Sequence, residues 1–433
     1  MKKWIALILC VLTVLSLFGC GEKAPESTKT PKRDYSAFAG YVQDPKTWYD
    51  ELMALPIANE NMSEDELRQL CVAAMRFNLT FPWTPTMDIN YSFTLLERTS
   101  EVSLPANKTA YSGLFYCNNN ARGNVWKALR YYDPETGAMD IEAMGGQLLS
   151  VLSSACARGC EWGWGRVSNS TGLETMSSYN QYNSNIALVG SYSYAPGRYA
   201  FGNGSGTQDI IRDNGEDVIV DSYAVMKPAD GVYSSSSYHV MMVADNPVIV
   251  YDKDGKIDRE ESYVLVLEQD AIGTKTEKKN YVQENGKTMR PLGGVDNKYT
   301  FQDLLDKGYI PFTVKELIGQ EPVEAGDAWI GSQTTRIENG TDMVLSDVLT
   351  KTLFTNYAIC TIEAQVKDPE GKVLLTGYCD NQTTPFTYHA FISNSDFEEA
   401  AASYANGKNT VHIYVRMSNG ELKEAFTTVL KVA

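Results

Sequence analysis

Histidine is scarce in this sequence of 433 residues, which contains His239, His389 and His412 and no others. A catalytic or metal site that depends on imidazole therefore has few candidate residues. Cysteine is also sparse, at eight residues, and none of them forms the C-x-x-C pair that is typical of zinc and thiol redox motifs. We accordingly expect no metal ion and no cofactor.

Basic residues are outnumbered, with 38 Lys and Arg against 54 Asp and Glu and a formal net charge of −16. A protein that binds nucleic acid through its phosphates needs a basic surface, so we expect no nucleic-acid partner. Charge alone also disfavours adsorption to an anionic membrane. With 43% hydrophobic residues, the chain is long enough to form two or three packed domains.

An apolar run lies at the amino terminus, where Lys2 and Lys3 precede the stretch 4–18 and the tetrapeptide LFGC at 17–20. This order is typical of a secretory signal. The tetrapeptide resembles the bacterial lipobox, which implies cleavage before Cys20, a lipid on the Cys20 sulfur, and an extracytoplasmic protein anchored to the bacterial cell membrane. An uncleaved membrane anchor is the alternative, although the run is short for a spanning helix.

The rest of the sequence predicts an α+β domain followed by an all-β domain. Ser63 and Glu66 form a capping box that predicts the start of a helix, and β-branched and aromatic segments between turns predict an antiparallel meander at 231–268. The terminal strands resemble an immunoglobulin-like β-sandwich. The expected parts are a signal peptide at 1–19, a flexible tether at 20–34, an α+β domain at 35–320 (amino-terminal helices at 44–79, core at about 110–315) and a β-sandwich at 321–433.

The segment 153–167 (SSACARGCEWGWGRV) predicts a helix that has Cys156 in its first turn. Ser153 and Ser154 are suitable cap residues, and the unpaired N–H groups and dipole of a helix start favour the thiolate form of a cysteine. The Cys156 thiol is therefore a candidate nucleophile. Two alternatives stay open: the cysteine is inert and buried, or the apolar segment 147–154 extends the helix backward and leaves Cys156 in its middle.

A cysteine nucleophile needs a base, and His239 is the candidate because His389 and His412 fall in the β-rich terminal part. A third residue must accept the other ring N–H and orient the imidazole. Glu268 or Gln269, at the end of the next predicted strand, can supply that oxygen. Side chains alternate along a strand, so one of these two residues faces the histidine.

The sequence contains a helix start at Cys156, the turn PADG at 228–231, the strand HVMMV at 239–243 and a polar residue on the next strand. This arrangement is similar to the NlpC-type branch of papain-like cysteine peptidases, which cut peptidoglycan stem peptides. The segments 156–167 and 227–269 also look like those of clostridial cell-surface lipoproteins with a terminal β-domain. The resemblance implies a papain-like core with an antiparallel sheet and a lipid-anchored amidase or endopeptidase acting on cell-wall peptide. Ala155 and Ala157 replace the polar neighbours that the family usually has around its cysteine.

In this scheme the implied roles are nucleophile for Cys156, base and then acid for His239, and orientation of His239 for Glu268 or Gln269. The candidate substrate-binding residues are aromatic: Trp162, Tyr192 and Tyr194. The alternative function is a catalytically degenerate surface lipoprotein that uses such aromatic residues to bind peptide or glycan.

A structural zinc site is a third interpretation of the same region. It would use Cys117, Cys156, Cys160 and His239 as ligands, but the C-x3-C spacing is loose for zinc and the other ligands would have to converge from distant parts of the chain. Thiol reactivity and metal analysis separate these interpretations.

A hairpin is predicted around the turn 368–371 (DPEG). If Lys367 and Lys372 are opposed across this turn, Cys360 faces Cys379 on the two strands, close enough for a disulfide bond in an extracytoplasmic compartment. A pair of reduced thiols is the alternative, and a bulge between the turn and the cysteines would break the register.

The lipobox-like tetrapeptide yields a first prediction. Intact-mass analysis of protein extracted from membranes should show that residues 1–19 are absent and that Cys20 carries lipid, because the basic start, the apolar run and the tetrapeptide coincide. An unmodified thiol on Cys20 would contradict this expectation.

Overall fold

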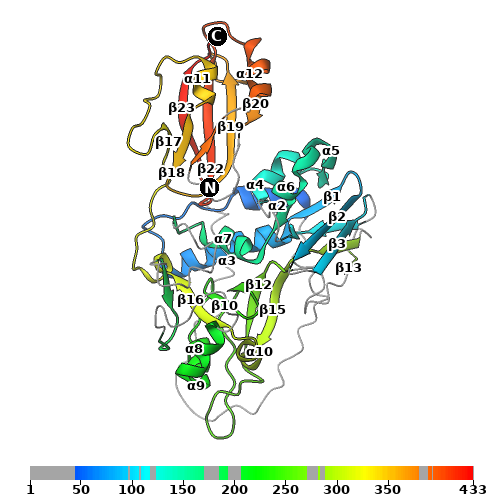
Figure 1. Ribbon diagram of the computed structural model, residues 1–433, viewed down its shortest axis with the longest axis vertical. Coiled ribbons are helices and arrows are strands. Elements are labelled where there is room, and N and C mark those ends of the chain that lie inside the picture. Colours follow the sequence, from blue (N-terminus) through cyan, green and yellow to red (C-terminus); the bar gives the residue numbers. More distant parts are fainter. Residues whose placement is uncertain are drawn as a thin grey trace, which may run out of the picture. The chain divides into compact units, whose positions relative to one another are not determined.

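The structure is a computed structural model of the whole chain, and its residues from Ala39 to Ala433 form one compact unit. The described residues are 44–95, 98–106, 109–117, 123–169, 185–193, 206–270, 281–282, 288–379, 389–392 and 394–432. The expected signal peptide, Cys20 and the tether lie outside these residues. The described chain combines helices with several antiparallel sheets, so the predicted α+β class is confirmed (Figure 1).

The capping box at Ser63 and Glu66 is confirmed. The N–H of Glu66 donates to the Ser63 hydroxyl at 3.3 Å, and the Glu66 carboxylate accepts from the N–H of Ser63 at 2.8 Å. These two bonds satisfy donors that a helix start leaves unpaired. The helices are α2 (Pro45–Met53), α3 (Glu64–Thr80), α4 (Val125–Ala128), α5 (Ile141–Met144), α6 (Leu148–Leu152), α7 (Cys156–Trp164), α8 (Gly206–Asn214), α9 (Glu216–Ala224), α10 (Phe301–Asp306), α11 (Leu345–Leu349) and α12 (Ser395–Ala402).

The central sheet contains the predicted meander, with antiparallel pairing between its neighbouring strands. Its order is β15 (Gly294–Thr300), β12 (Tyr263–Glu268), β11 (His239–Val243), β10 (Gly231–Ser234), β16 (Ile310–Val314) and β9 (Ile186–Leu188). The segment 248–251, predicted as a strand, forms isolated bridges instead, from Val248 to Tyr263 and from Tyr251 to Ile257.

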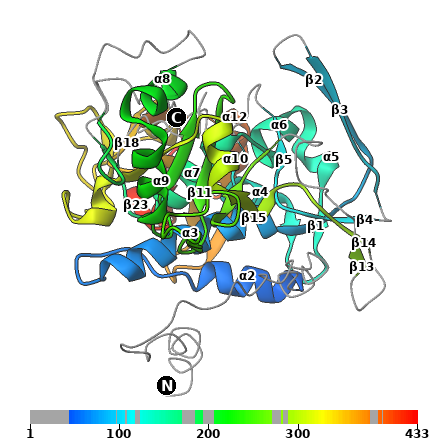
Figure 2. The same cartoon turned by 90° about the horizontal axis from the view of Figure 1, so that it is seen from below.

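A second sheet mixes parallel and antiparallel pairs. Its order is β13 (Tyr281–Val282), β14 (Thr288–Pro291), β4 (Thr109–Ser112), β1 (Pro82–Pro85), β7 (Ala138–Met139) and β6 (Tyr132–Asp133). Figure 2 shows β2 (Ile89–Leu95) and β3 (Arg98–Leu104) as a two-stranded ribbon. The short strands β5 (Phe115–Tyr116) and β8 (Ser153–Ser154) pair in parallel just before α7.

The carboxyl-terminal part consists of antiparallel strands around their own hydrophobic cluster. One sheet has the order β17 (Ala328–Gly331), β18 (Thr352–Thr355) and β21 (His389–Phe391), and the other β20 (Val373–Tyr378), β19 (Ile359–Lys367), β22 (Thr410–Met417) and β23 (Leu422–Val429). Along β22, buried side chains alternate with half-buried ones. Alternation of this kind is expected of strands with one face on a core.

The predicted opposition of Cys360 and Cys379 is wrong. On β19 and β20, Glu363 pairs with Tyr378, and the N–H of Cys379 donates to the carbonyl of Ile362 at 3.1 Å. A bulge at Leu374 and a longer turn shift the register by two residues. Both cysteines are buried and neither forms a disulfide bond.

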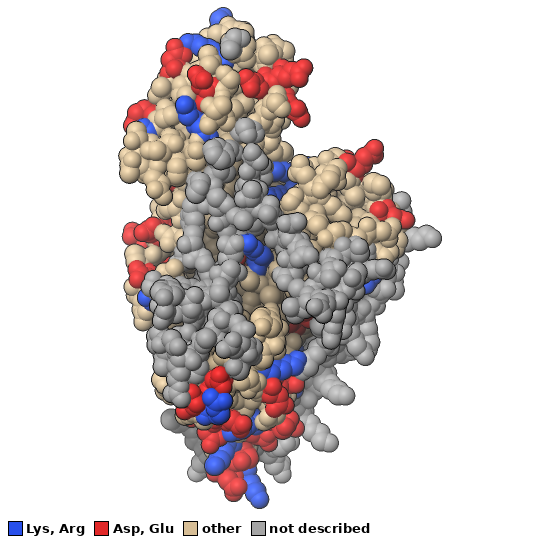
Figure 3. Space-filling model, in the orientation of Figure 1, with Lys and Arg blue, Asp and Glu red and all other residues tan. Residues whose placement is uncertain are grey.

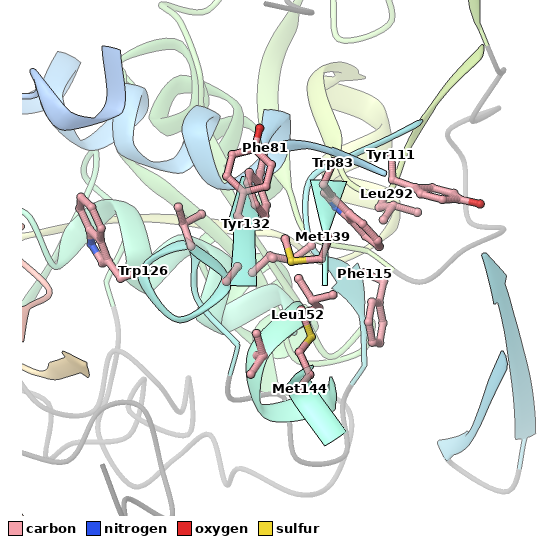
Figure 4. Close-up of a cluster of buried hydrophobic side chains, with 14 of the residues drawn as sticks. Phe81, Trp83, Tyr111, Phe115, Trp126, Tyr132, Met139, Met144, Leu152 and Leu292 are labelled. Atoms are coloured by element: carbon pink, nitrogen blue, oxygen red, sulfur yellow. The ribbon is translucent and has the colours of Figure 1, made fainter. Parts of the chain in front are cut away.

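The amino-terminal hydrophobic cluster is rich in aromatic residues, as Figure 4 shows. Phe81 packs against Trp48 and Tyr132 with ring centroids 4.8 Å apart in each pair, and Trp83 lies 5.1 Å from Tyr111. Buried aromatic pairs of this kind add to the free energy of unfolding beyond the area they bury. The cluster supports the segment that leads into α7.

Helix α7 lies close to α3 and β11 because glycine occupies its contact face. A Cβ atom on Gly163 would lie 2.6 Å from Cε of Met242 and 2.8 Å from the carbonyl oxygen of Cys71. A Cβ atom on Gly159 would lie 3.0 Å from Cβ of Gln269. Gly163 has no space for a side chain and Gly159 has very little, so the glycines set how near Cys156 comes to the central sheet.

The carboxyl-terminal part of the chain contacts Arg166, which follows the end of α7, and Trp126 of α4. Arg166 is 2% exposed, and its Nη1 donates to the carbonyl of Asn419 at 3.2 Å. Arg416 lies over the Trp126 ring at 4.2 Å, and Arg166 lies 6.0 Å from the same ring. Burial lowers the pKa of the Arg166 guanidinium to about 10.

Charged side chains of both signs are interspersed on the face that Figure 3 shows. Elsewhere in the described chain, an ion-pair cluster joins Arg259 to Glu216 and Asp217. Among the described residues, no helix is long and apolar enough to cross a membrane.

The tight packing of α7 leads to a stability prediction. Gly163→Ala should lower the free energy of unfolding by about 1–3 kcal/mol, because the added methyl group overlaps a backbone oxygen, even though Ala is the better helix former. Urea unfolding measures the change. Gly146→Ala is the control, since a Cβ there meets no atom within 4 Å, and its effect should stay within about 0.5 kcal/mol. Equal stability of the two variants would contradict the packing argument.

Candidate active site

Helix α7 begins at Cys156 and does not continue backward into the preceding apolar segment. Helix α6 ends at Leu152, and the backbone of Ser153 and Ser154 pairs with β5. The N–H of Cys117 donates to the Ser154 carbonyl at 3.0 Å. Ala155 is the N-cap residue, with extended backbone, φ −112° and ψ 171°. Cys156 is therefore the first helical residue, with the dipole and unpaired N–H groups of a helix start beside it.

His239 begins β11 directly after a residue with left-handed backbone. Tyr238 has φ 48°, which is unusual for a residue other than glycine. Its carbonyl oxygen lies 3.9 Å from Sγ of Cys156. The His239 side chain is 14% exposed, and its imidazole interacts with the Cys156 thiol. The strand start thus brings the imidazole next to the sulfur.

Glu268, at the end of β12, is the residue that contacts His239. Its Oε2 lies 2.9 Å from Nε2 of His239, and its side chain is 1% exposed. Gln269 faces another direction, where its Nε2 donates to the Leu114 carbonyl at 2.8 Å. Sequence reasoning left both residues open, and their alternation along the strand puts Glu268 on the histidine side.

The electrostatics of the three side chains favour a charged pair of thiolate and imidazolium. Burial raises the pKa of the Cys156 thiol, but the hydrogen bond and charge of His239 outweigh it, and the pKa lies below its ordinary value. For His239, burial lowers the pKa, while the hydrogen bonds with Cys156 and Glu268 raise it well above the ordinary value. Opposite charges at contact distance produce these shifts.

Glu268 is held in its charged form. Burial raises the pKa of this carboxyl, and the hydrogen bonds from His239, Asn297 and Tyr299 outweigh that effect, so that the net shift is downward. Cys160, one helical turn after Cys156, shows the contrast: burial raises its pKa well above the ordinary value of a thiol. Two cysteines on one helix therefore have opposite chemistry.

The aromatic candidates for substrate binding need correction. Trp162 is 4% exposed and packs with Trp126 at 6.4 Å in the amino-terminal hydrophobic cluster. Tyr192 is 3% exposed, and its hydroxyl donates to the Pro311 carbonyl at 2.6 Å. Both are interior residues, so little of either side chain is open to contact with a substrate. Tyr194 lies outside the described residues.

Sequence reasoning missed Asn297 and Tyr299, which contact Glu268. Nδ2 of Asn297 donates to Oε1 of Glu268, and the Tyr299 hydroxyl is 3.3 Å from each carboxylate oxygen. The two residues are separated by one position on β15 and share a face. This spacing of polar residues after Gly293 and Gly294 was the available signal.

The zinc interpretation finds no support in the described part of the chain. There, no group of three or more His, Cys, Asp or Glu side chains is placed to hold a metal ion. All four candidate ligands of that interpretation are among the described residues.

Comparison with known proteins gave no relative for this fold or site. The chain matches no protein-family model, no curated protein and no solved structure.

Proposed function

We propose that this protein is a cysteine hydrolase that cleaves amide bonds with Cys156 as nucleophile, His239 as general base and acid, and Glu268 as the residue that orients the imidazole. The observation that carries the proposal is the arrangement of the Cys156 thiol at a helix start, the His239 imidazole that acts on its pKa, and the buried Glu268 carboxylate 2.9 Å from Nε2 of His239. A nucleophile, a base and an orienting oxygen in this order form a unit known from several unrelated hydrolases.

The first step uses the thiolate form of Cys156 and the imidazolium form of His239, which the pKa shifts favour. The Cys156 thiolate adds to the amide carbonyl carbon, and the resulting oxyanion is within the influence of the unpaired N–H groups at the start of α7. The His239 imidazolium then gives its proton to the leaving nitrogen as the C–N bond breaks, which leaves a thioester on Cys156. Water attacks this thioester while His239 takes a proton from the water. The C–S bond then breaks, which releases the carboxylic acid product and restores the thiolate.

Glu268 serves this cycle by binding one ring nitrogen. Because Nε2 of His239 is engaged by Glu268, Nδ1 is the nitrogen left to exchange a proton with the sulfur or the substrate. A carboxylate also stabilises the imidazolium that each half-reaction requires.

The proposed architecture is papain-like, with an immunoglobulin-like module at the carboxyl terminus. Support for the first part comes from α7, which carries the thiol and packs against the antiparallel sheet that carries His239 and Glu268 on adjacent strands. Support for the second comes from the antiparallel sheets around a common hydrophobic cluster. We infer that this module positions the hydrolase on its substrate.

We propose cell-wall peptide as the substrate and a lipid at Cys20 as the membrane anchor. The lipobox-like tetrapeptide and the NlpC-type residues around Cys156 and His239 support this assignment. An extracytoplasmic, membrane-anchored hydrolase has access to the peptides of the wall.

Mutation of the two reacting groups tests the proposed chemistry. Cys156→Ala and His239→Ala should each reduce hydrolysis of a peptidoglycan stem peptide by about 10³-fold or more, because nucleophile and base act as a unit. Released amine or carboxyl groups measure the rate. Cys160→Ala is the matched control, since it removes a thiol one turn away whose raised pKa makes it unreactive, and it should keep most of the activity. Binding of the peptide without hydrolysis by the unmodified protein would favour the degenerate binding protein instead.

The pKa shifts predict how the reactivity of Cys156 depends on pH. The thiolate is lost as the pH falls through the lowered pKa of Cys156, and the imidazolium is lost as the pH rises through the raised pKa of His239. At pH 6 an ordinary thiol is less than about 1% thiolate, so iodoacetamide should alkylate Cys156 far faster than it alkylates a model thiol.

In His239→Ala the rate at pH 6 should fall by about tenfold or more, and the rate should then rise with pH through the ordinary thiol range. Mass spectrometry of the Cys156 peptide reports the extent of reaction. An unchanged alkylation rate in His239→Ala would show that the pairing is wrong.

A further inference from the structure

We propose that Asn297 and Tyr299 are positioning residues that hold the Glu268 carboxylate against His239 and thereby maintain the Cys156 thiolate in acidic solution. This inference rests on the proposed function, and it extends the site from three residues to five. Both side chains contact Glu268 and act on the sulfur through it.

The contacts account for both oxygens of the buried carboxylate. Oε2 of Glu268 lies 2.9 Å from Nε2 of His239, and Oε1 accepts a hydrogen bond from the Asn297 amide. The Tyr299 hydroxyl is 3.3 Å from both oxygens. A carboxylate that is 1% exposed is stable as an anion when donors replace the water it has lost.

The backbone of β15 is shaped to bring Asn297 to Glu268. The pairing of β12 with β15 shifts between Val266 and Glu268, which marks a bulge in the ladder. Within it, Gly294 lies so close that a Cβ there would be 2.2 Å from Nδ2 of Asn297 and 2.8 Å from Cγ of Glu268. A side chain at Gly294 would displace one partner of the hydrogen bond.

An ion pair supports the strained residue next to Asn297. Asp296 has φ 54°, in the left-handed region, and its carboxylate binds Arg76 of α3 through both oxygens. Left-handed backbone at a residue other than glycine persists where surrounding contacts determine it, and it is frequent at functional sites. The Arg76 contact thus stabilises the turn that aims Asn297 at the carboxylate.

The groups around Glu268 determine what its protonation would do. Several titratable groups face the Glu268 carboxylate or its hydrogen-bond donors from neighbouring elements. They are His239 on β11, Cys156 and Cys160 on α7, Tyr299 on β15, and Asp270 and Tyr309, which both interact with Tyr299. His239 supplies the positive charge in this group. If Glu268 takes up a proton, the imidazolium loses its counter-charge and returns its proton to the sulfur, and the thiolate disappears.

The test is the pH profile of Cys156 alkylation in the full-length protein, read by mass spectrometry of the Cys156 peptide with iodoacetamide as the probe. In Tyr299→Phe and in Asn297→Asp the acid limb should move to higher pH by about one unit, since a hydrogen bond to a charged group is worth about that much. Asn297→Asp keeps the side-chain shape but replaces the donor with an acceptor, so its shift should be the larger.

Tyr309→Phe is the matched control. It removes a hydroxyl in the same region, whereas the hydrogen bonds to Glu268 come from His239, Asn297 and Tyr299, so its acid limb should stay where the unmodified protein has it. A limb that does not move in Tyr299→Phe, or that moves equally in Tyr309→Phe, would overturn the inference. If Asn297→Asp fails to fold, Tyr299→Phe decides the question, because it deletes a single hydroxyl.

Hydrolysis of the stem peptide is measured in parallel. A shifted acid limb without hydrolysis by the unmodified protein would refute the proposed hydrolase and support the positioning roles. Hydrolysis by the unmodified protein, together with an acid limb that does not move in the variants, would support the proposed hydrolase and refute the positioning roles.

Discussion

The buried hydrogen bond between His239 and Glu268 is the interaction on which the candidate site depends. A carboxylate with so little solvent exposure costs several kcal/mol unless it is paired and hydrogen-bonded, and here the imidazolium, an amide and a phenol provide the partners. The pair in turn supplies the positive charge beside Cys156. Loss of any partner would leave a charge uncompensated in the protein interior. The bulge between β12 and β15, the left-handed residue Asp296 and the packing of α7 all help to bring these partners together.

The contrast between Cys156 and Cys160 shows how local the chemistry is. Both residues lie on one face of α7, and burial acts on both in the same direction. The imidazole next to Cys156 reverses the effect there, whereas burial and nearby negative charges keep Cys160 a thiol. The glycines of α7 contribute by letting the helix approach the sheet closely enough for this contact.

Local signals predicted part of this structure well. The capping residues at Ser63 and Glu66 determine a helix start by themselves, and the choice of His239 followed from the scarcity of histidine. The start of α7 was ambiguous from the sequence, because pairing of Ser153 and Ser154 with a strand some 40 residues earlier decides it. Propensity carries no information about such distant pairing.

The errors have similar causes. The hairpin register failed because the turn is longer than expected and Leu374 is an extra residue in β20, and neither feature follows from the residue pattern of the two strands. Trp162 was expected to contact a ligand, but aromatic residues are as useful in a core as at a surface. Asn297 could not be linked to Glu268 because a left-handed residue and an ion pair to a distant helix bring it there.

The contact between Arg166 and Asn419 has a consequence for how the protein matures. The helix that carries Cys156 ends two residues before Arg166, and the guanidinium finds its backbone acceptor in a turn near the end of the chain. Ribosomes make the amino-terminal part first, so Arg166 meets its acceptor only after the chain has grown by 253 further residues. The far end of the helix that carries Cys156 is therefore completed after the candidate site residues have been made, and a chain that lacks Asn419 leaves the Arg166 guanidinium without this acceptor.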